Sequence, residues 1–394
     1  MTQLESAKNK EITNEVDIVS KRENLDSKFV MELVASGRVV ILKNNSRKNA
    51  LPTGIGENLM VKINGTVGTT NKNTAIKQEI EKAELIESLE VDTLTDLSTG
   101  KGVDLTRKKI INSITIPIGS TPFLQTIKEV SDKTCDLVNI DKDYILSNIE
   151  KHLRDGVDFI TLHAGMTKNN AYQYDETERK MGLVSRSGSI LNWWMKQTEK
   201  ENPMYENFNE ILDLLKMYDA VLSLGNGYRA GCICDFMDRA QTAELIVNGE
   251  LVQRARQMGV QVMVEGGGYV PYNKIEVYTK TIKEITSHAP LYMLGPIVTD
   301  IGIGYDDYTS AIGSVQAGLY GADFISVITS SEGMDYPNME TLKRGITVSK
   351  LVAHSINISR GIKEEIKRDD LMAVAKRSFN TKDQKKYAID STVF

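Results

Sequence analysis

The sequence has few cysteines and no long hydrophobic run. Its three cysteines are Cys135, Cys232 and Cys234, which are too few and too irregularly spaced for a disulfide framework and fit a reducing compartment. Cys232 and Cys234 also lack the second cysteine pair that a structural metal site would need. No run approaches the roughly 18 apolar residues of a membrane span, and the start, MTQLESAKNKEITNEV, lacks the apolar centre of a signal peptide. We therefore expect a cytoplasmic protein that does not associate with membranes.

A basic stripe and the common nucleotide-binding fingerprints are also missing. The formal net charge is -5, from 48 Lys and Arg against 53 Asp and Glu, and the lysines are scattered among glutamates. Such a surface does not match a nucleic-acid backbone, so nucleic acid is not an expected partner. There is neither a GxGxxG nor a GKS/T motif, which removes the dinucleotide and P-loop fingerprints. With 394 residues, 41% of them hydrophobic, the chain can bury a large core.

From about residue 60, short β-rich runs alternate with stretches of helical length. The expected strands are MVKING (60–65), DTLTDLS (92–98), SITIPIG (113–119), DFITLHAG (158–165), AVLSLGN (220–226), VQVMVEG (260–266), LYMLGPI (291–297) and ADFISVIT (322–329). Eight strand–helix units predict an α/β fold of the (β/α)8 TIM-barrel type. A doubly wound open sheet would give a similar pattern.

The pattern divides the chain into three regions. Residues 1–55 form a polar, helix-leaning N-terminal extension, 56–358 contain the barrel, and 359–394 form a charged helical tail. In the first crossover, Asn73-Thr74 is expected to cap a helix. The stretch LVSRSGSI (183–190) interrupts the fourth crossover.

In such a barrel, the carboxyl ends of the strands and the loops after them build the active site. The polar residues expected at these ends are Asn64, Asp96 with Ser98, Gly119, His163, Asn226 with Arg229, Glu265, Tyr292 and Thr329. Ser98 and Thr329 are readily explained as helix caps. His163 and Glu265 are harder to explain by folding alone, because burying either side chain costs free energy unless it is paired.

Two glycine-containing stretches suit a phosphate group. SRSGS (185–189) offers hydroxyls, the Arg186 guanidinium and backbone N–H groups, and GNGYRAG (225–231) places Arg229 beside flexible backbone. Either stretch alone is a weak signal.

A larger pattern is carried by stretches spread along the chain. They are DLSTG (96–100), LHAG (162–165), VSRSGSI (184–190), NPMYENFNEIL (202–212), SLGNGYRAGC (223–232), QVMVEGGGYVP (261–271), LYMLGPIVTDIGIGYDDYTSAIG (291–313) and KLVAHSINISRG (350–361). In this order, and nearly without gaps from about residue 27 to 380, the sequence resembles the phosphomethylpyrimidine synthase family. That family consists of radical S-adenosylmethionine lyases that rearrange 5-aminoimidazole ribotide into the thiamine pyrimidine.

The resemblance implies a (β/α)8 barrel with the ribotide at the strand ends. The ribotide contacts implied by position are His163, Ser185, Arg186, Ser187, Asn226, Gly227, Tyr228, Arg229, Glu265 and Tyr292. Arg186 and Arg229 would suit the phosphate as planar donors, and Glu265 could accept from ribose hydroxyls or the ring amine. His163 could act as a donor or proton shuttle. His163 and Glu265 are the candidate catalytic residues.

Several positions depart from the family pattern. Where the family has asparagine, methionine and tyrosine contacts on the first three strands, this chain has Thr66, Thr95 and Leu124, so we expect a reshaped base end of the pocket. Asn226 replaces the aspartate of the family's D-G-L-R stretch, which removes a charge but keeps an acceptor. Phosphate and ribose binding are expected to survive.

The metal positions depart as well. In the family, zinc is bound by the histidine of E-G-P-G-H-V-P and by the histidine of A-A-H-A, which are matched here by Tyr269 and His354. A phenol with a pKa near 10 competes poorly with imidazole for zinc at neutral pH. Zinc binding is therefore doubtful, and His354 alone would hold zinc weakly.

The resemblance also implies S-adenosylmethionine and a [4Fe-4S] cluster, which the family holds through a C-terminal C-x2-C-x4-C segment. No cysteine follows Cys234 in this sequence, which ends at KKYAIDSTVF. We therefore expect that this chain does not ligate the cluster itself and cannot cleave S-adenosylmethionine alone.

Different functions are compatible with these departures. The chain is either a partner-dependent or degenerate lyase, a non-catalytic ribonucleotide-binding or regulatory protein, or a truncated synthase. A benzimidazole-forming relative that uses the same ribotide is a further alternative. The expected partners are a small-molecule ribonucleotide and either a second copy of the chain or a cluster-bearing homologue.

Overall fold

The computed structural model describes residues 1–70 and 75–394, and within them eight parallel strands close into a barrel. The strands, in spatial order, are β10 (Phe324–Ser326), β3 (Lys62–Val67), β4 (Thr93–Asp96), β5 (Ile118–Ser120), β6 (Phe159–Leu162), β7 (Val221–Leu224), β8 (Val262–Tyr269) and β9 (Leu291–Ile297). The predicted barrel is confirmed, and the open sheet was the wrong alternative. Each predicted run overlaps one strand.

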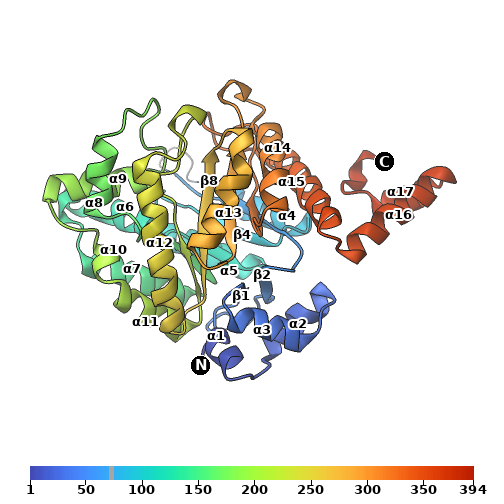
Figure 1. Ribbon diagram of the computed structural model, residues 1–394, viewed down its shortest axis with the longest axis horizontal. Coiled ribbons are helices and arrows are strands. Elements are labelled where there is room, and N and C mark those ends of the chain that lie inside the picture. The colour runs from blue at the N-terminus through green and yellow to red at the C-terminus, as the bar shows by residue number, and fades with distance from the viewer. Residues whose placement is uncertain (71–74) are drawn as a thin grey trace.

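Helices surround the barrel strands (Figure 1). They are α4 (Ile76–Ser88), α5 (Val103–Ser113), α6 (Pro122–Thr134), α7 (Lys142–Asp155), α8 (Lys168–Asp175), α9 (Arg186–Thr198), α10 (Pro203–Glu206), α11 (Phe208–Tyr218), α12 (Arg239–Gln257), α13 (Ile275–Ile285), α14 (Asp306–Leu319) and α15 (Met339–Ser359). Short 3-10 turns lie at Leu137–Asn139, Ile233–Asp235, Tyr272–Lys274, Asp300–Gly302 and Ser391–Val393. The predicted cap of α4, Asn73-Thr74, lies outside the described residues.

The barrel core follows from the alternation of side chains along each strand. Successive residues of a strand point to opposite faces. Ile160, Leu222 and Val264 belong to the large apolar layer between strands and helices. The residues that precede two of them, Phe159 and Val221, belong to a smaller apolar cluster inside the barrel. This explains why both faces of the strands are apolar near their amino ends.

The N-terminal extension closes the amino end of the barrel. It contains α1 (Gln3–Lys8), α2 (Asn14–Glu23), α3 (Ser27–Ala35) and an antiparallel pair, β1 (Val39–Leu42) and β2 (Thr53–Gly56), and it lies below the barrel in Figure 1. Val40 and Ile55 of this pair join the inner apolar cluster. A buried ion pair of 2.7 Å between Arg47 and Asp158 also fixes the segment. The sequence predicted helices here but not the two strands.

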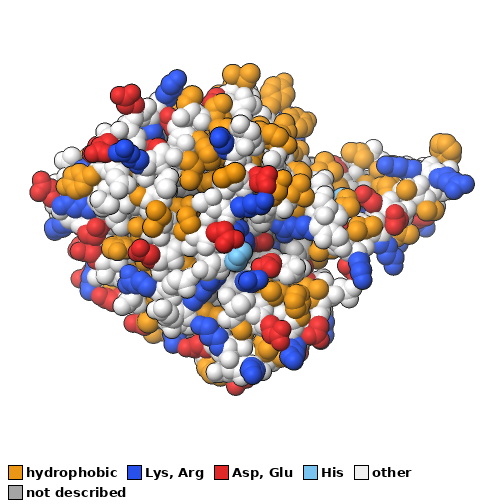
Figure 2. Space-filling model, in the orientation of Figure 1, with side chains coloured by type: hydrophobic (Ala, Val, Ile, Leu, Met, Phe, Trp, Pro, Cys, Tyr) orange, Lys and Arg blue, Asp and Glu red, His pale blue; other side chains and the backbone are white. Residues whose placement is uncertain are grey.

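The C-terminal helices α16 (Lys363–Arg377) and α17 (Thr381–Tyr387) project away from the barrel (Figure 1). Only Ala375 of α16 is buried, and no residue of α17 is. In the view of Figure 2, basic and acidic side chains are interspersed over the surface. None of the described helices combines the length and the apolar character that crossing a membrane requires.

Candidate functional site

Glu265 lies inside the barrel and not on a loop at its rim. The sequence predicted that the strand stops near this carboxylate, but β8 continues to Tyr269 through a bulge between Gly267 and Tyr269. The Glu265 side chain is 7% exposed, and its Oε1 accepts hydrogen bonds from Thr161 Oγ1 (3.0 Å) and Ser223 Oγ (3.5 Å). Burial raises the pKa of Glu265, although the Arg229 charge and the hydrogen bonds oppose this shift. The carboxylate is therefore held from neighbouring strands.

The glycines after Glu265 allow β8 to continue close to other backbone segments. Gly267 and Gly268 have φ of 106° and 86°, a region that side chains disfavour. A Cβ at Gly267 would lie 2.2 Å from Leu294 O, and one at Gly268 would lie 2.6 Å from Ala230 O. The N–H of Tyr269 donates to the same Ala230 oxygen at 3.1 Å. The triple glycine thus joins β8 to the loop after β7.

His163, directly after β6, is a buried neutral imidazole. Burial, followed by the charge of Arg229, lowers the pKa of His163 to about 3. Its Nε2 lies 2.8 Å from Ser185 Oγ. That hydroxyl also accepts from Gly188 N–H at 3.1 Å. Nδ1 has no partner in residues 1–70 and 75–394 and faces Gly225, where a Cβ would lie 2.3 Å from it.

The predicted phosphate stretch 185–189 forms the first turn of α9. Ser187 Oγ also approaches His163 Nε2, at 3.4 Å, so both serines of this stretch lie at the histidine. Arg186 is exposed at the start of the helix. Leu124, another predicted site residue, is buried in the first turn of α6.

The second predicted phosphate stretch is held from behind by Glu244 of α12. The carboxylate accepts the N–H groups of Gly227 at 2.7 Å and Tyr228 at 2.8 Å. These two donors are therefore not available to a phosphate. Burial raises the pKa of Glu244 to about 7, although the two N–H groups and Arg229 oppose the shift. Arg229 is partly buried and donates to Asn226 O at 3.2 Å.

Tyr292 belongs to a polar layer deeper in the barrel. The sequence placed it at the carboxyl end of a strand, but it is the second residue of β9, which continues through Gly295 to Ile297. Its hydroxyl accepts from Asn64 Nδ2 at 2.8 Å. The Asn64 oxygen in turn accepts from Thr93 (2.8 Å) and Thr95 (3.1 Å). Thr66, paired with Thr95 across β3 and β4, lies beside this layer.

The two predicted zinc positions lie on different elements, Tyr269 at the end of β8 and His354 on α15. Tyr269 is partly buried, and burial and the charges of Asp306, Asp300 and Glu332 raise its pKa. His354 lies on α15 about 22 Å along the axis from Met339, where that helix begins.

Both ring nitrogens of His354 are occupied, by Glu365 and, at 3.0 Å, by Asp369. Burial alone would lower the pKa of His354, but these carboxylates outweigh it and raise the pKa. In the described part of the chain, no group of three or more His, Cys, Asp or Glu side chains is arranged to hold a metal.

The three thiols are also dispersed. Cys135 is exposed at the end of α6, a helix of 13 residues that spans about 20 Å from the carboxyl toward the amino ends of the strands. Cys232 and Cys234 lie in the loop after β7, at the opposite end of the barrel. These thiols do not form a common cluster site.

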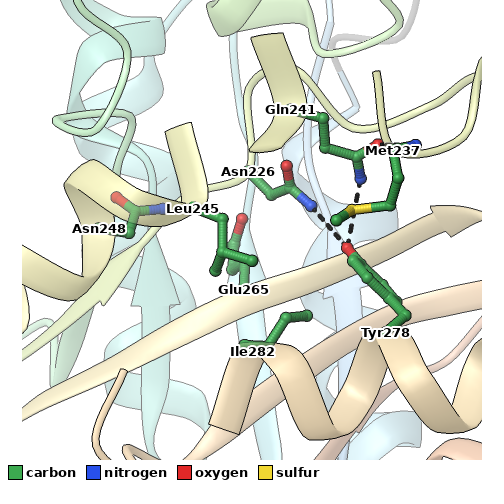
Figure 3. Close-up of a pocket in the computed structure, with 8 residues that line it drawn as sticks. All are labelled: Asn226, Met237, Gln241, Leu245, Asn248, Glu265, Tyr278 and Ile282. Atoms are coloured by element: carbon green, nitrogen blue, oxygen red, sulfur yellow. Dashed lines mark hydrogen bonds between the residues drawn. The ribbon is translucent and has the colours of Figure 1, made fainter. Parts of the chain in front are cut away.

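Sequence reasoning missed the polar residues of two helices that support the site from outside the barrel. Figure 3 shows Gln241 and Asn248 of α12 and Tyr278 of α13 around a small cavity that Asn226 and Glu265 also line. A signal was present, since Gln241, Glu244 and Asn248 recur at spacings of three and four on the buried face of α12. Polar residues on a buried helix face indicate specific partners.

Comparisons with known proteins extend over the whole chain. It is 43% identical over 390 residues to a phosphomethylpyrimidine synthase of Thermoanaerobacter sp. (strain X514), covering 99% of this chain and 90% of that protein. It is 42% identical over 390 residues to the phosphomethylpyrimidine synthase of Methanocaldococcus jannaschii, covering 99% and 91%.

Among solved structures, a dihydropteroate synthase of Coxiella burnetii matches with a TM-score of 0.45 and 10% identity, covering 81% of this chain and 99% of that one. The model of the Radical SAM ThiC family matches residues 2–393. The chain therefore belongs to the Radical SAM ThiC family.

Proposed function

We propose that this chain binds 5-aminoimidazole ribotide at the carboxyl end of the barrel and serves in the phosphomethylpyrimidine synthase reaction of thiamine pyrimidine biosynthesis. Relatives that carry this name are 43% and 42% identical to it. The observation that carries the proposal is the convergence of His163, Arg229 and Glu265. The charge of Arg229 lowers the pKa of both His163 and Glu265. The three residues come from different loops and strands of the barrel.

The groups around this convergence suit a ribonucleotide. Arg229 and Arg186 supply cations at the rim, and planar guanidinium groups bind phosphate with two parallel hydrogen bonds. Glu265 offers a buried acceptor for ribose hydroxyls or the ring amine. Because its pKa is raised, Glu265 is also suited to take up a proton within the site. We assign His163, in its neutral form, to positioning through Ser185.

The threonines shape the deep end of the pocket. Thr66 and Thr95 lie beside the layer formed by Asn64 and Tyr292. Their hydroxyls offer short hydrogen-bonding groups to the base end of a ligand. We propose that this end of the pocket distinguishes the ligand's base, while the rim binds its phosphate.

The family name implies S-adenosylmethionine and an iron–sulfur cluster. A [4Fe-4S] cluster of this kind requires three thiolates close together. Cys135 lies at the opposite end of the barrel from Cys232 and Cys234, so the thiols of this sequence do not fit the cluster. We propose that its thiolates come from residues outside these 394, and no reaction step is derived through it. Zinc does not fit Tyr269 and His354 either, because both ring nitrogens of His354 already pair with Glu365 and Asp369. No reaction step is derived through zinc.

Calorimetry with 5-aminoimidazole ribotide tests the binding proposal. The unaltered protein should bind it, and Arg229→Ala should weaken binding by roughly 1.5–3 kcal/mol through loss of a charged hydrogen bond. Arg239→Ala is the matched control, since Arg239 is an exposed arginine paired with Glu176. Failure of the unaltered protein to bind the ribotide would remove the proposal.

A further inference from the structure

Three N–H groups converge on one phenol oxygen behind the site. Tyr278 of α13 is 3% exposed. Its hydroxyl oxygen lies 3.0 Å from Gly267 N, 3.2 Å from Asn226 Nδ2 and 3.3 Å from Gln241 Nε2. Figure 3 shows the two side-chain amides pointing at this oxygen. The hydroxyl thereby joins the loop after β7, strand β8 and helix α12.

The donors and acceptors at this oxygen can be assigned. A backbone N–H such as that of Gly267 can only donate. The amide of Gln241 is fixed, because its Oε1 accepts the N–H of Met237 at 2.8 Å, which leaves Nε2 as the donor toward Tyr278. These two N–H groups occupy both lone pairs of the phenol oxygen. Burial raises the pKa of Tyr278, so the phenol keeps its proton and must donate it.

Asn226 is the remaining neighbour of that proton. Its amide has an oxygen end and a nitrogen end of nearly the same shape, and only the oxygen end can accept. We infer that Tyr278 holds the Asn226 side chain with Oδ1 toward the phenol and Nδ2 directed away from it. The expectation that Asn226 keeps an acceptor for the ligand is thereby replaced, because the group offered to the ligand is an N–H donor.

The inference sets the ligand chemistry at this position and rests on the proposed function for its site. The far end of the Asn226 amide points away from Tyr278 (Figure 3) and has no hydrogen-bond partner in residues 1–70 and 75–394. The backbone N–H of Asn226 lowers the pKa of Glu265, and both residues line the same small cavity. A ligand atom with a free lone pair, such as a hydroxyl or phosphate oxygen, fits this donor. An ammonium group does not.

Neutron diffraction from a crystal of the deuterated full chain tests the assignment directly. The expected result is one deuteron on the Tyr278 oxygen directed at Asn226, with both amide deuterons of Asn226 on the side away from the phenol. Amide deuterons of Asn226 directed at Tyr278 would overturn the inference. This measurement needs no ligand, so it stands even if ribotide binding fails.

A double-mutant cycle in 5-aminoimidazole ribotide binding tests the positioning role. Tyr278→Phe should weaken binding about tenfold, because the amide is no longer held in one orientation. In an Asn226→Ala background, the same change should have no further effect, because Tyr278 acts through Asn226. A tenfold effect that persists in that background would show a merely structural role and refute positioning.

Tyr218→Phe is the matched control. Tyr218 is partly buried, and its hydroxyl makes no hydrogen bond within the described residues. The Tyr218→Phe variant should bind the ribotide as tightly as the unaltered protein does. If the unaltered protein binds no ribotide, the proposed function fails, and the neutron result decides the inference alone.

Discussion

The Glu244 carboxylate holds the backbone of Gly227 at 2.7 Å from outside the barrel. With its second oxygen on Tyr228 N–H, this side chain of α12 fixes the loop that carries Asn226 and Arg229. A bidentate contact of this kind uses both oxygens as acceptors. The loop is therefore positioned by a helix side chain, not by glycine flexibility alone.

Glu244→Gln should destabilise the protein in a pH-dependent way. Glutamine can accept only one of the two N–H groups, and its NH₂ opposes the other. The pKa of Glu244 is raised from 4.5 to about 7, so its titration contributes stability that is fully present below 4.5 and lost as the pH rises through 7. Urea unfolding should show a difference between the two proteins that shrinks by up to about 3 kcal/mol between pH 5 and 8. A difference that does not change with pH would contradict the role of this carboxyl group.

Asp219→Asn should stabilise the protein at alkaline pH. Asp219 ends α11 in the left-handed region, with φ of 49°, and its oxygens accept the N–H of Gln3 at 3.0 and 3.2 Å. Burial raises its pKa from 3.8 to about 8, so its contribution to stability is lost as the pH rises through 8. Asparagine tolerates this backbone conformation, keeps one acceptor and carries no charge.

We expect the advantage of the asparagine variant over the unaltered protein to grow by up to about 4 kcal/mol between pH 5 and pH 9. Thermal unfolding at both pH values measures this. The control is Asp213→Asn, at an exposed position of the same helix. An equal gain at both pH values would point to a cause other than titration.

His163 should remain neutral well below the ordinary histidine range. Its pKa is lowered to about 3, so its contribution to stability is present above 6.5 and lost as the pH falls toward 3. Nitrogen NMR of histidine-labelled protein should show His163 as a neutral imidazole at pH 5. His354 is the internal comparison, because its pKa is raised and it should titrate above 6.5. A His163 signal that titrates near 6.5 would show that the imidazole is not buried as described.

The sequence was sufficient to predict the barrel, because each strand is a β-branched or apolar run between helical stretches. Strand ends were less predictable. Glu265 was expected at the end of its strand, but glycines that normally end strands continue β8 through a bulge to Tyr269. The pairing of β1 with β2 was missed, since Val40 and Ile55 acquire their apolar environment only against the barrel.

Only part of the candidate site could be predicted from the sequence. His163 and Glu265 stand out because polar residues interrupt apolar strands. Glu244 and Tyr278 lie within helices, where a polar or aromatic residue is ordinary, and their partners are distant in sequence. Only the fold reveals that Tyr278 faces Gly267 and that Glu244 faces Gly227.

Because Cys135 lies about 20 Å from the end of the barrel that carries Cys232 and Cys234, this chain alone should not assemble a [4Fe-4S] centre on anaerobic reconstitution. Visible absorption measures the cluster. Release of 5′-deoxyadenosine measures cleavage of S-adenosylmethionine. Neither the cluster absorption nor this release should be observed.

When the chain is mixed with a homologue that bears C-x2-C-x4-C, 5′-deoxyadenosine release should depend on His163 and Glu265 of this chain. Arg239→Ala should leave that release unchanged. Release that is indifferent to His163→Ala and Glu265→Gln would place the reaction in the homologue's own barrel, and this chain would then act as a ribonucleotide-binding protein.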